Sequence, residues 1–160
     1  MVKFQEVLKN LNSHQVEYII IGGYAAVLHG ASYATNDVDI CYHRTKQNLE
    51  SIVHVLKPFR PKLRTIDGDV PFLFDTKTLL AGMNFTLSTD LGDIDLLGEV
   101  SGVGNYQNMI KNAEPTVVFQ EKCFVISLLD LLKTKKAVGR PKDLSLVDQI
   151  EALIKAKEKF

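Results

Sequence analysis

The sequence predicts a fold with both helices and strands, α/β in the broad sense and α+β in the narrower one. Helices flank a mixed, twisted β-sheet, and a C-terminal helical tail closes one side. Apolar residues recur at the spacing of one helical face near both ends of the chain. Between them lie short runs of β-branched and aromatic residues, separated by glycines and prolines, which indicate strands and turns. With 160 residues, 46% of them apolar, the chain can bury one core, so we expect a single domain over residues 1–160.

The first part of the chain alternates between helical and strand patterns. Phe4, Val7 and Leu11 share one helical face. The β-branched run before Gly22-Gly23 is typical of a buried strand, and Pro58 ends a later helix. The expected elements are a helix over residues 3–12, a strand over 16–21, a helix over 24–28, a strand over 37–42 and a helix that ends before residue 58.

The second part of the chain begins with residues 57–82, where only two short strands are expected. Later segments show clearer patterns. The expected elements are strands over 63–66, 70–74, 85–88 and 93–97, a β-prone stretch over 117–127 with a break at 120–122, and helices over 128–136 and 144–157. The core is therefore expected over about residues 16–127 and the helical tail over about 128–160.

Charge and hydropathy exclude several classes of protein. The 19 basic and 19 acidic side chains cancel, which argues against a generic basic nucleic-acid binder. No apolar run approaches the roughly 18 residues that span a bilayer. The first residues also lack the apolar core of a secretory signal, so we expect a cytoplasmic protein without a membrane segment. Cys41 and Cys123 are expected to be reduced core thiols.

The neutral total hides an uneven distribution of charge. Residues 65–110 contain seven acidic side chains and one basic one, Lys77. Basic residues gather instead in residues 57–64 and 133–142. Separated charges of this kind suit a site where carboxylates hold a cation and basic groups bind a polyphosphate.

Asp37 and Asp39 form the first part of a candidate metal site. Because side chains alternate along a strand, these two carboxylates point to the same side and repel each other unless a cation lies between them. Hard oxygen ligands of this kind suit Mg²⁺, which completes its coordination with water and substrate phosphates. Asp95, on a later strand, would add a third carboxylate and allow two metal ions.

Gly22 and Gly23 supply the second part of the pattern. A double glycine between a strand and a helix lets a phosphate approach backbone N–H groups at the positive end of the helix. Each piece has a simpler interpretation, because an Asp-x-Asp pair is often a solvated face and Gly-Gly is often a turn. Their combination in this order favours a nucleotide–metal site.

The motifs resemble the signature of the nucleotidyltransferase superfamily with the DNA polymerase β-type catalytic fold. Ile20-Ile21-Gly22-Gly23-Tyr24-Ala25 followed by Thr35-Asn36-Asp37-Val38-Asp39-Ile40 matches its strand, glycines and acidic strand, and Ile94-Asp95-Leu96 matches its third carboxylate. The resemblance covers about residues 16–150. It implies a nucleotidyltransferase that moves a nucleoside monophosphate from a nucleoside triphosphate (NTP) such as ATP to an acceptor hydroxyl and releases pyrophosphate.

The resemblance also implies a role for each motif residue. Asp37 and Asp39 would bind Mg²⁺, whereas Asp95 would bind a second metal ion and help to deprotonate the acceptor. Gly22 and Gly23 would hold the phosphates.

Two further motifs resemble small bacterial enzymes related to abortive-infection and toxin–antitoxin nucleotidyltransferases. These motifs are His29-Gly30 and Arg140-Pro141-Lys142-Asp143. The resemblance places Lys135, Arg140 and Lys142 at the triphosphate, while Asp143 is expected to cap the last helix. It also implies the alternative of a toxin-type transferase that acts on tRNA or a partner protein and is controlled by an antitoxin.

Tyr33 departs from the pattern of these relatives. It stands where they often carry arginine, in the pattern Arg-x-Thr-x-Asp, which favours a catalytically silent nucleotide-binding module as a rival to the enzyme. A small-molecule acceptor and a homodimer that completes the acceptor wall are also left open. His29 and Tyr106 are expected to be structural, although they could act near a phosphate and a base. The basic residues 57–64 are expected to form a solvated loop, with an RNA contact as the alternative.

Overall fold

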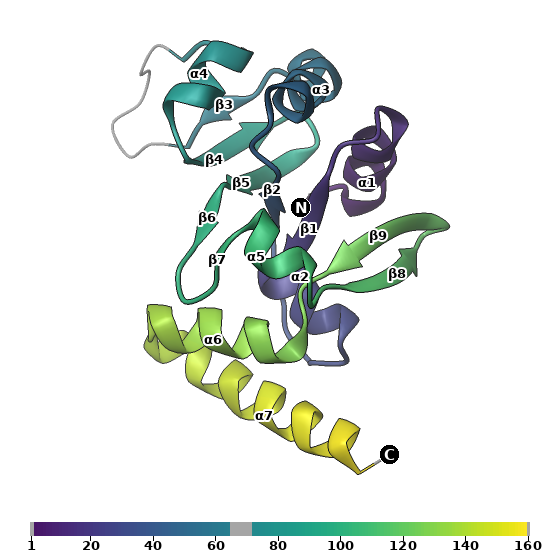
Figure 1. Ribbon diagram of the computed structural model, residues 1–160, viewed down its shortest axis with the longest axis vertical. Coiled ribbons are helices and arrows are strands. Elements are labelled where there is room, and N and C mark those ends of the chain that lie inside the picture. Colours follow the sequence, from purple (N-terminus) through teal and green to yellow (C-terminus); the bar gives the residue numbers. More distant parts are fainter. Residues whose placement is uncertain (1, 65–71, 160) are drawn as a thin grey trace.

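The computed structural model describes residues 2–64 and 72–159 (Figure 1). The helices are α1 (Phe4–Ser13), α2 (Gly22–Leu28), α3 (Lys46–Leu56), α4 (Thr76–Ala81), α5 (Tyr106–Ile110), α6 (Leu128–Val138) and α7 (Leu144–Glu158). The strands are β1 (Tyr18–Ile21), β2 (Asp37–Tyr42), β3 (Lys62–Leu63), β4 (Asn84–Thr89), β5 (Gly92–Leu97), β6 (Glu99–Val100), β7 (Gly104–Asn105), β8 (Glu114–Val118) and β9 (Glu121–Val125). Short 3-10 turns cover Lys57–Phe59 and Pro141–Asp143.

Seven strands form a mixed sheet in the order β3-β4-β5-β2-β1-β9-β8, and β6 pairs with β7 separately. The central strands β2 and β5 are parallel, as are β1 and β9, while the remaining neighbours are antiparallel. This confirms the predicted mixed sheet flanked by helices.

Strand β2 shows how the sequence divides between the two faces of the sheet. Val38 and Ile40 are fully buried, whereas Asp37 and Asp39, which alternate with them, are only partly covered. Strand β5 repeats this pattern with buried Ile94 and Leu96. Because side chains on neighbouring strands in register share a face, the apolar residues build the core and the acidic residues meet on the opposite side.

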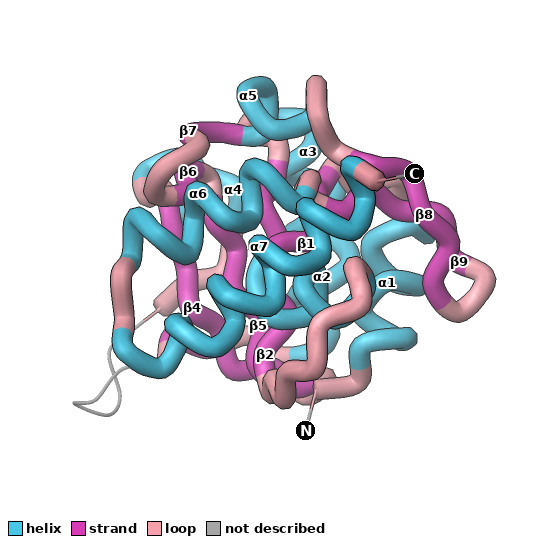
Figure 2. The backbone as a smooth tube through the Cα atoms, turned by 90° about the horizontal axis from the view of Figure 1, so that it is seen from below, coloured by secondary structure: helices cyan, strands magenta, loops and turns pink. Residues whose placement is uncertain are grey.

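Some helices pack close to the sheet, and the two C-terminal helices lie together at one end of the molecule. Helix α1 packs against α3 and β9, so it belongs with the core although the sequence placed the core start near residue 16. Helices α6 and α7 pack on each other, and α6 also contacts α2, as the predicted C-terminal tail requires. Figure 2, in which the molecule is seen from below, shows α6 and α7 side by side on the side that faces the viewer, which is the lower end in Figure 1.

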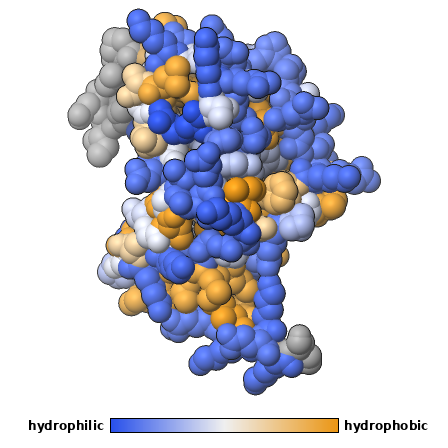
Figure 3. Space-filling view, viewed as in Figure 1, coloured by the Kyte–Doolittle hydropathy of each residue, from blue (hydrophilic) through white to orange (hydrophobic). Residues whose placement is uncertain are grey.

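The surface of this lower end is more apolar than the rest of the face shown in Figure 3, where hydrophilic residues dominate above it. Leu129 on α6 and Leu144 on α7 are each more than 60% exposed. Within residues 2–64 and 72–159, no helix combines the length and the apolar character that crossing a bilayer requires.

Several elements differ from the sequence-based expectations. The β-prone stretch near residues 117–127 belongs to the hairpin β8–β9, whose turn lies at 119–120, slightly before the break expected at 120–122, so Glu121 and Lys122 are part of β9. The described residues 72–74 are not a strand, and helix α4 follows them where no helix was expected. Strands β6 and β7 and helix α5 were also missed, because elements of two to five residues carry too little periodicity. The remainder of the two short strands expected at 63–66 and 70–74 lies outside the described residues.

Asn48 fixes the end of the β1–β2 pair by hydrogen bonds to the backbone. Its amide nitrogen donates to the carbonyl oxygens of Glu17 (3.0 Å) and His43 (2.8 Å), and its amide oxygen accepts from the N–H of Glu17 at 2.7 Å. Glu17 precedes β1 and His43 follows β2, while Asn48 lies on α3 and is 4% exposed. One buried amide therefore links two strands and a helix.

We expect Asn48→Ala to lower the free energy of unfolding by about 2–3 kcal/mol, because it leaves buried backbone groups without hydrogen-bond partners. Chemical denaturation measures the change. Asn10→Ala is the matched control, since Asn10 is partly exposed and donates only to the Glu6 carbonyl within its own helix. We expect that variant to stay within about 0.5 kcal/mol of the wild type. Equal losses in both variants would contradict the role given to Asn48.

Candidate active site

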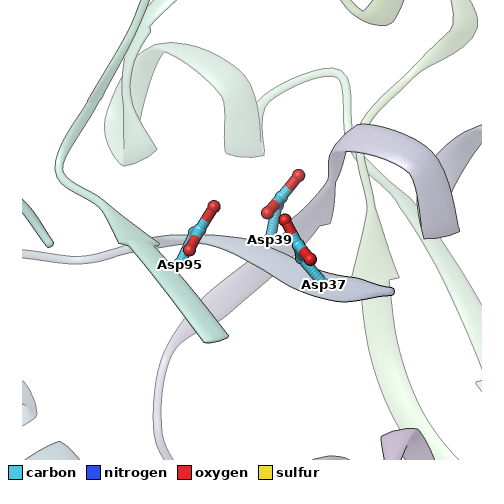
Figure 4. Close-up of side chains that lie close together, drawn as sticks. All are labelled: Asp37, Asp39 and Asp95. Carbon is cyan, nitrogen blue, oxygen red and sulfur yellow. The ribbon is translucent and has the colours of Figure 1, made fainter. Parts of the chain in front are cut away.

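Three carboxylates from two neighbouring strands meet on one side of the sheet. The parallel register of β2 and β5 places Asp39 opposite Asp95 and Asp37 opposite Asp93. One carboxylate oxygen each from Asp37, Asp39 and Asp95 lies within 4.8 Å of the other two. Figure 4 shows these three side chains projecting from the strands toward the same side. The structure therefore brings together the three acids singled out in the sequence.

Asp39 is the most unfavourably placed of the three acids. Its Oδ1 atom is buried and has no hydrogen-bond partner among the residues that the structure describes. Burial raises the pKa of Asp39, and the charges of Asp95 and Asp37 raise it further. Lys135 lies close enough for its charge to oppose that rise. A site that confines carboxylates in this way favours either a bound proton or a bound cation.

The arrangement fits a divalent metal ion. Three carboxylates from rigid strands are the hard, anionic ligands that Mg²⁺ requires. The unpartnered Oδ1 of Asp39 offers a lone pair that no group in residues 2–64 and 72–159 uses. Asp37, Asp39 and Asp95 would therefore hold such an ion, and its charge would relieve the repulsion between them.

The two glycines allow α2 to begin directly beside the acids. Gly22 has a φ of +68°, and a Cβ atom there would lie 2.2 Å from Oδ2 of Asp39. A Cβ at Gly23 would lie 2.8 Å from side-chain atoms of Tyr33 and Thr35. The sequence had suggested that this helix begins at residue 24, but α2 begins at Gly22. The glycines thus admit neighbouring side chains, and their contact with a phosphate stays a prediction.

Arg64 is a member of the site that the sequence did not reveal. Its Nη2 atom donates to Oδ1 of Asp95 at 2.7 Å and lies 3.9 Å from Asp37, while Nη1 lies 3.9 Å from Asp93. The sequence had suggested that Arg64 belongs to a solvated basic loop. The available signal was its position directly after the apolar Leu63, at the edge of the sheet beside β4.

No known protein family and no curated protein sequence matches the chain. Solved structures match it clearly. A lincomycin-bound lincosamide antibiotic adenylyltransferase superposes with a TM-score of 0.63 and 16% identity over 94% of this chain and 95% of that one. A Thermotoga maritima protein assigned to the nucleotidyltransferases gives 0.53 and 14%, covering 100% and 97%. An antigenic nucleotidyltransferase-like protein of Paracoccidioides brasiliensis gives 0.56 and 18%, covering 94% and 73%.

The chain has the nucleotidyltransferase fold. This confirms the fold that the glycine and Asp-x-Asp motifs predicted. At 14–18% identity the likeness concerns the fold alone, so the chemistry has to be argued from the residues of the site.

The C-terminal tail carries the residues that were predicted to contact the triphosphate. Lys135, on α6, is 9% exposed, and its Nζ lies 3.9 Å from Oδ1 of Asp143. Arg140 Nε donates to Oδ2 of Asp143 at 2.9 Å. Asp143 stands at the N-cap position of α7, as expected, but its side chain makes no capping hydrogen bond. It is instead a buried anion between two cations. The side chain of Lys142 lies outside the described part of the chain.

The two residues expected to be structural have that role. His29 donates from Nε2 to the carbonyl oxygen of Ile126 at 2.7 Å, with its side chain 8% exposed. The Tyr106 ring is buried and stacks on the His43 ring at a centroid distance of 4.7 Å. Cys41 and Cys123 are free, buried thiols, as expected.

A polar cavity of about 390 Å³ opens beyond the carboxyl ends of β2 and β5. His43 and Arg44 follow β2 at one wall, Glu99 begins β6, and Asn105 of β7 and Tyr106 of α5 close the cavity. Asp39 precedes Tyr42, the last residue of β2, by three positions, or about 10 Å along an extended strand. The residues that line this cavity do not include Asp37, Asp39 or Asp95, so the cavity lies beyond the carboxylates along the same two strands.

We expect Gly22→Ala to destabilise the protein more than glycine replacement at a matched position. The variant places a side chain in the left-handed region and against Asp39, with a combined loss of about 3–5 kcal/mol. Gly139→Ala is the control, because Gly139 has a φ of +65° but its nearest neighbour would lie 3.7 Å from the new Cβ. That control should lose only about 1–2 kcal/mol. Chemical denaturation compares them, and equal losses would contradict the close contact with Asp39.

Proposed function

We propose that this protein is a metal-dependent nucleotidyltransferase that moves a nucleoside monophosphate from an NTP to an acceptor hydroxyl and releases pyrophosphate. The observation that carries the proposal is the convergence of Asp37, Asp39 and Asp95 around the unpartnered Oδ1 of Asp39. The fold, which the chain shares with an adenylyltransferase, supports the same chemistry.

In this proposal each carboxylate has its own task. Asp37 and Asp39 would hold the Mg²⁺ ion that accompanies the nucleotide, and Asp95 would hold a second ion. Bound metal ions would neutralise the triphosphate and stabilise the attacking and leaving oxygens. The acceptor oxygen forms a bond to the α-phosphorus as the bond to the β-phosphate breaks, and pyrophosphate leaves. Asp95 takes up the proton of the acceptor hydroxyl.

The cations of the tail supply the binding site for the leaving group. The ammonium group of Lys135 lies 3.9 Å from Asp143, and its charge also acts on Asp39, so it is placed near the site before a nucleotide arrives. Arg140 is tied to the same Asp143 and is itself exposed. We assign Lys135, Arg140 and Lys142 to the β- and γ-phosphates, with Gly22 and Gly23 near the helix start that faces the phosphates.

For the acceptor we favour a small, polar molecule. The cavity beyond β2 and β5 is lined by His43, Arg44 and Glu99 and by the α5 amides, which can bind hydroxyl and amino groups. The matched adenylyltransferase was solved with lincomycin, itself a small molecule. A tRNA acceptor, a protein acceptor controlled by an antitoxin, and a wall supplied by a second copy of the chain are the rival arrangements. ATP labelled in the α-phosphate, incubated with separated RNA, protein and metabolite fractions, identifies the acceptor class by which fraction gains label.

We expect Asp39→Asn to abolish pyrophosphate release, because it removes a metal ligand and one negative charge from the cluster. A loss of at least about 100-fold in rate is expected. Asp148→Asn, at an exposed position of α7, is the matched control and should keep the wild-type rate. A coupled pyrophosphate assay with NTP and Mg²⁺ measures both. Unchanged release in Asp39→Asn would overturn the assigned site, and no release by the wild type with any acceptor fraction would favour a silent nucleotide-binding module.

We expect Lys135→Met to weaken NTP binding by about tenfold, the effect of losing one charge-assisted contact to a phosphate. Lys133→Met is the matched control, two residues away on α6, because Lys133 is exposed and pairs within its own helix. Isothermal titration calorimetry with a non-hydrolysable ATP analogue and Mg²⁺ gives both affinities. Equal affinities would place the triphosphate elsewhere.

A further inference from the structure

Arg64 brings a permanent positive charge into the acidic cluster. Its guanidinium donates to Oδ1 of Asp95 at 2.7 Å and lies 3.9 Å from both Asp37 and Asp93. Two of these three acids belong to the proposed metal site. An arginine cannot lose its proton at any ordinary pH and cannot act as a metal ligand. It therefore occupies one side of the site as a competitor of a metal ion.

The sheet holds this guanidinium in place. The backbone N–H of Arg64 donates to the carbonyl oxygen of Thr86 at 3.0 Å, and Thr86 is opposite Asp95 in the β4–β5 register. Nη1 also donates to the carbonyl oxygen of Leu87 at 2.8 Å. The side chain is 28% exposed, so it lies against the sheet rather than in solvent. A surface arginine that met an acid by chance would lack this backbone anchor.

Arg60 provides a comparison within the same basic segment. It lies four residues earlier and pairs with Asp90 through two hydrogen bonds. Its side chain is 78% exposed, and its partner is not one of the three clustered acids. The two arginines have the same charge and the same kind of partner, but only Arg64 reaches the acids of the proposed metal site.

We propose that Arg64 is a built-in counter-ion that occupies Asp95 and lowers the affinity of the Asp37–Asp39–Asp95 site for a divalent cation. Asp95 then becomes a metal ligand only when Arg64 releases it. Arg64 is a positioning residue in this account, since it acts through Asp95. The inference rests on the metal site of the proposed function and concerns metal affinity in the absence of any nucleotide.

Binding of Mn²⁺, followed by the electron paramagnetic resonance signal of the free ion, tests the proposal on the full chain. We expect Arg64→Met to bind Mn²⁺ about three- to tenfold more tightly than the wild type, because one nearby positive charge is lost. Arg64→Lys keeps that charge and should stay within about twofold of the wild type. Arg60→Met removes an equal charge from the same segment and should not change the affinity.

The outcomes separate this inference from the proposed function. Binding by Arg64→Met that is no tighter than wild type, or equally tight binding by Arg64→Lys and Arg64→Met, would overturn the role of Arg64 alone. If the wild type binds Mn²⁺ and Asp39→Asn does not, the proposed metal site stands, whatever the result for the Arg64 variants. An absence of binding in the wild type and in Arg64→Met would overturn both proposals.

A second measurement needs no variant at the arginine. The side-chain Nε–Hε signals of Arg64 and Arg60 can be followed by NMR during a Mg²⁺ titration of the wild type. We expect the Arg64 signal to shift as Asp95 exchanges its arginine for the ion, while the Arg60 signal stays in place. Saturation of the site by Mg²⁺ without a change in the Arg64 signal would contradict the release of Asp95.

Discussion

The site depends on the parallel, in-register pairing of β2 with β5. That register sets Asp39 against Asp95, and the antiparallel pairing of β5 with β4 extends the same row to Thr86. Because side chains in one row of a sheet share a face, the buried apolar residues and the partly exposed acids are separated by the same alternation. The hydrophobic core therefore holds together carboxylates that would otherwise repel one another.

Two cations from distant parts of the sequence approach this row. Arg64 follows the edge strand β3, whereas Lys135 comes from α6 in the C-terminal tail. The balanced total charge of the chain thus hides one acidic segment and two basic ones, and each basic segment places one side chain near the acids. Asp143 orients Lys135 in turn, which makes the tail part of the electrostatics of the site. Neutrality of the whole chain gives no indication of these local fields.

The sequence predicted the mixed sheet, the helical tail and the three acids, because each rests on a local pattern such as the alternation of Asp37 and Asp39. It missed Arg64, because the ion pair of Arg64 with Asp95 depends on strand order, which spacing along the chain does not encode. The N-cap position of Asp143 was expected, but its ion pairs with Lys135 and Arg140 were not, because they depend on how α6 packs on α7. Helix α5 and strands β6 and β7 were missed for a different reason, since they are too short to show a period.

The in-register row of Asp39 and Asp95 across β2 and β5 also determines where residues can be inserted or deleted in this chain. A residue added to a loop leaves the order and register of the strands intact, so the connections between strands can vary freely. A residue inserted within β2 between Asp37 and Asp39 would turn one of these carboxylates into the apolar core. We therefore expect insertions and deletions to be confined to the connections between strands.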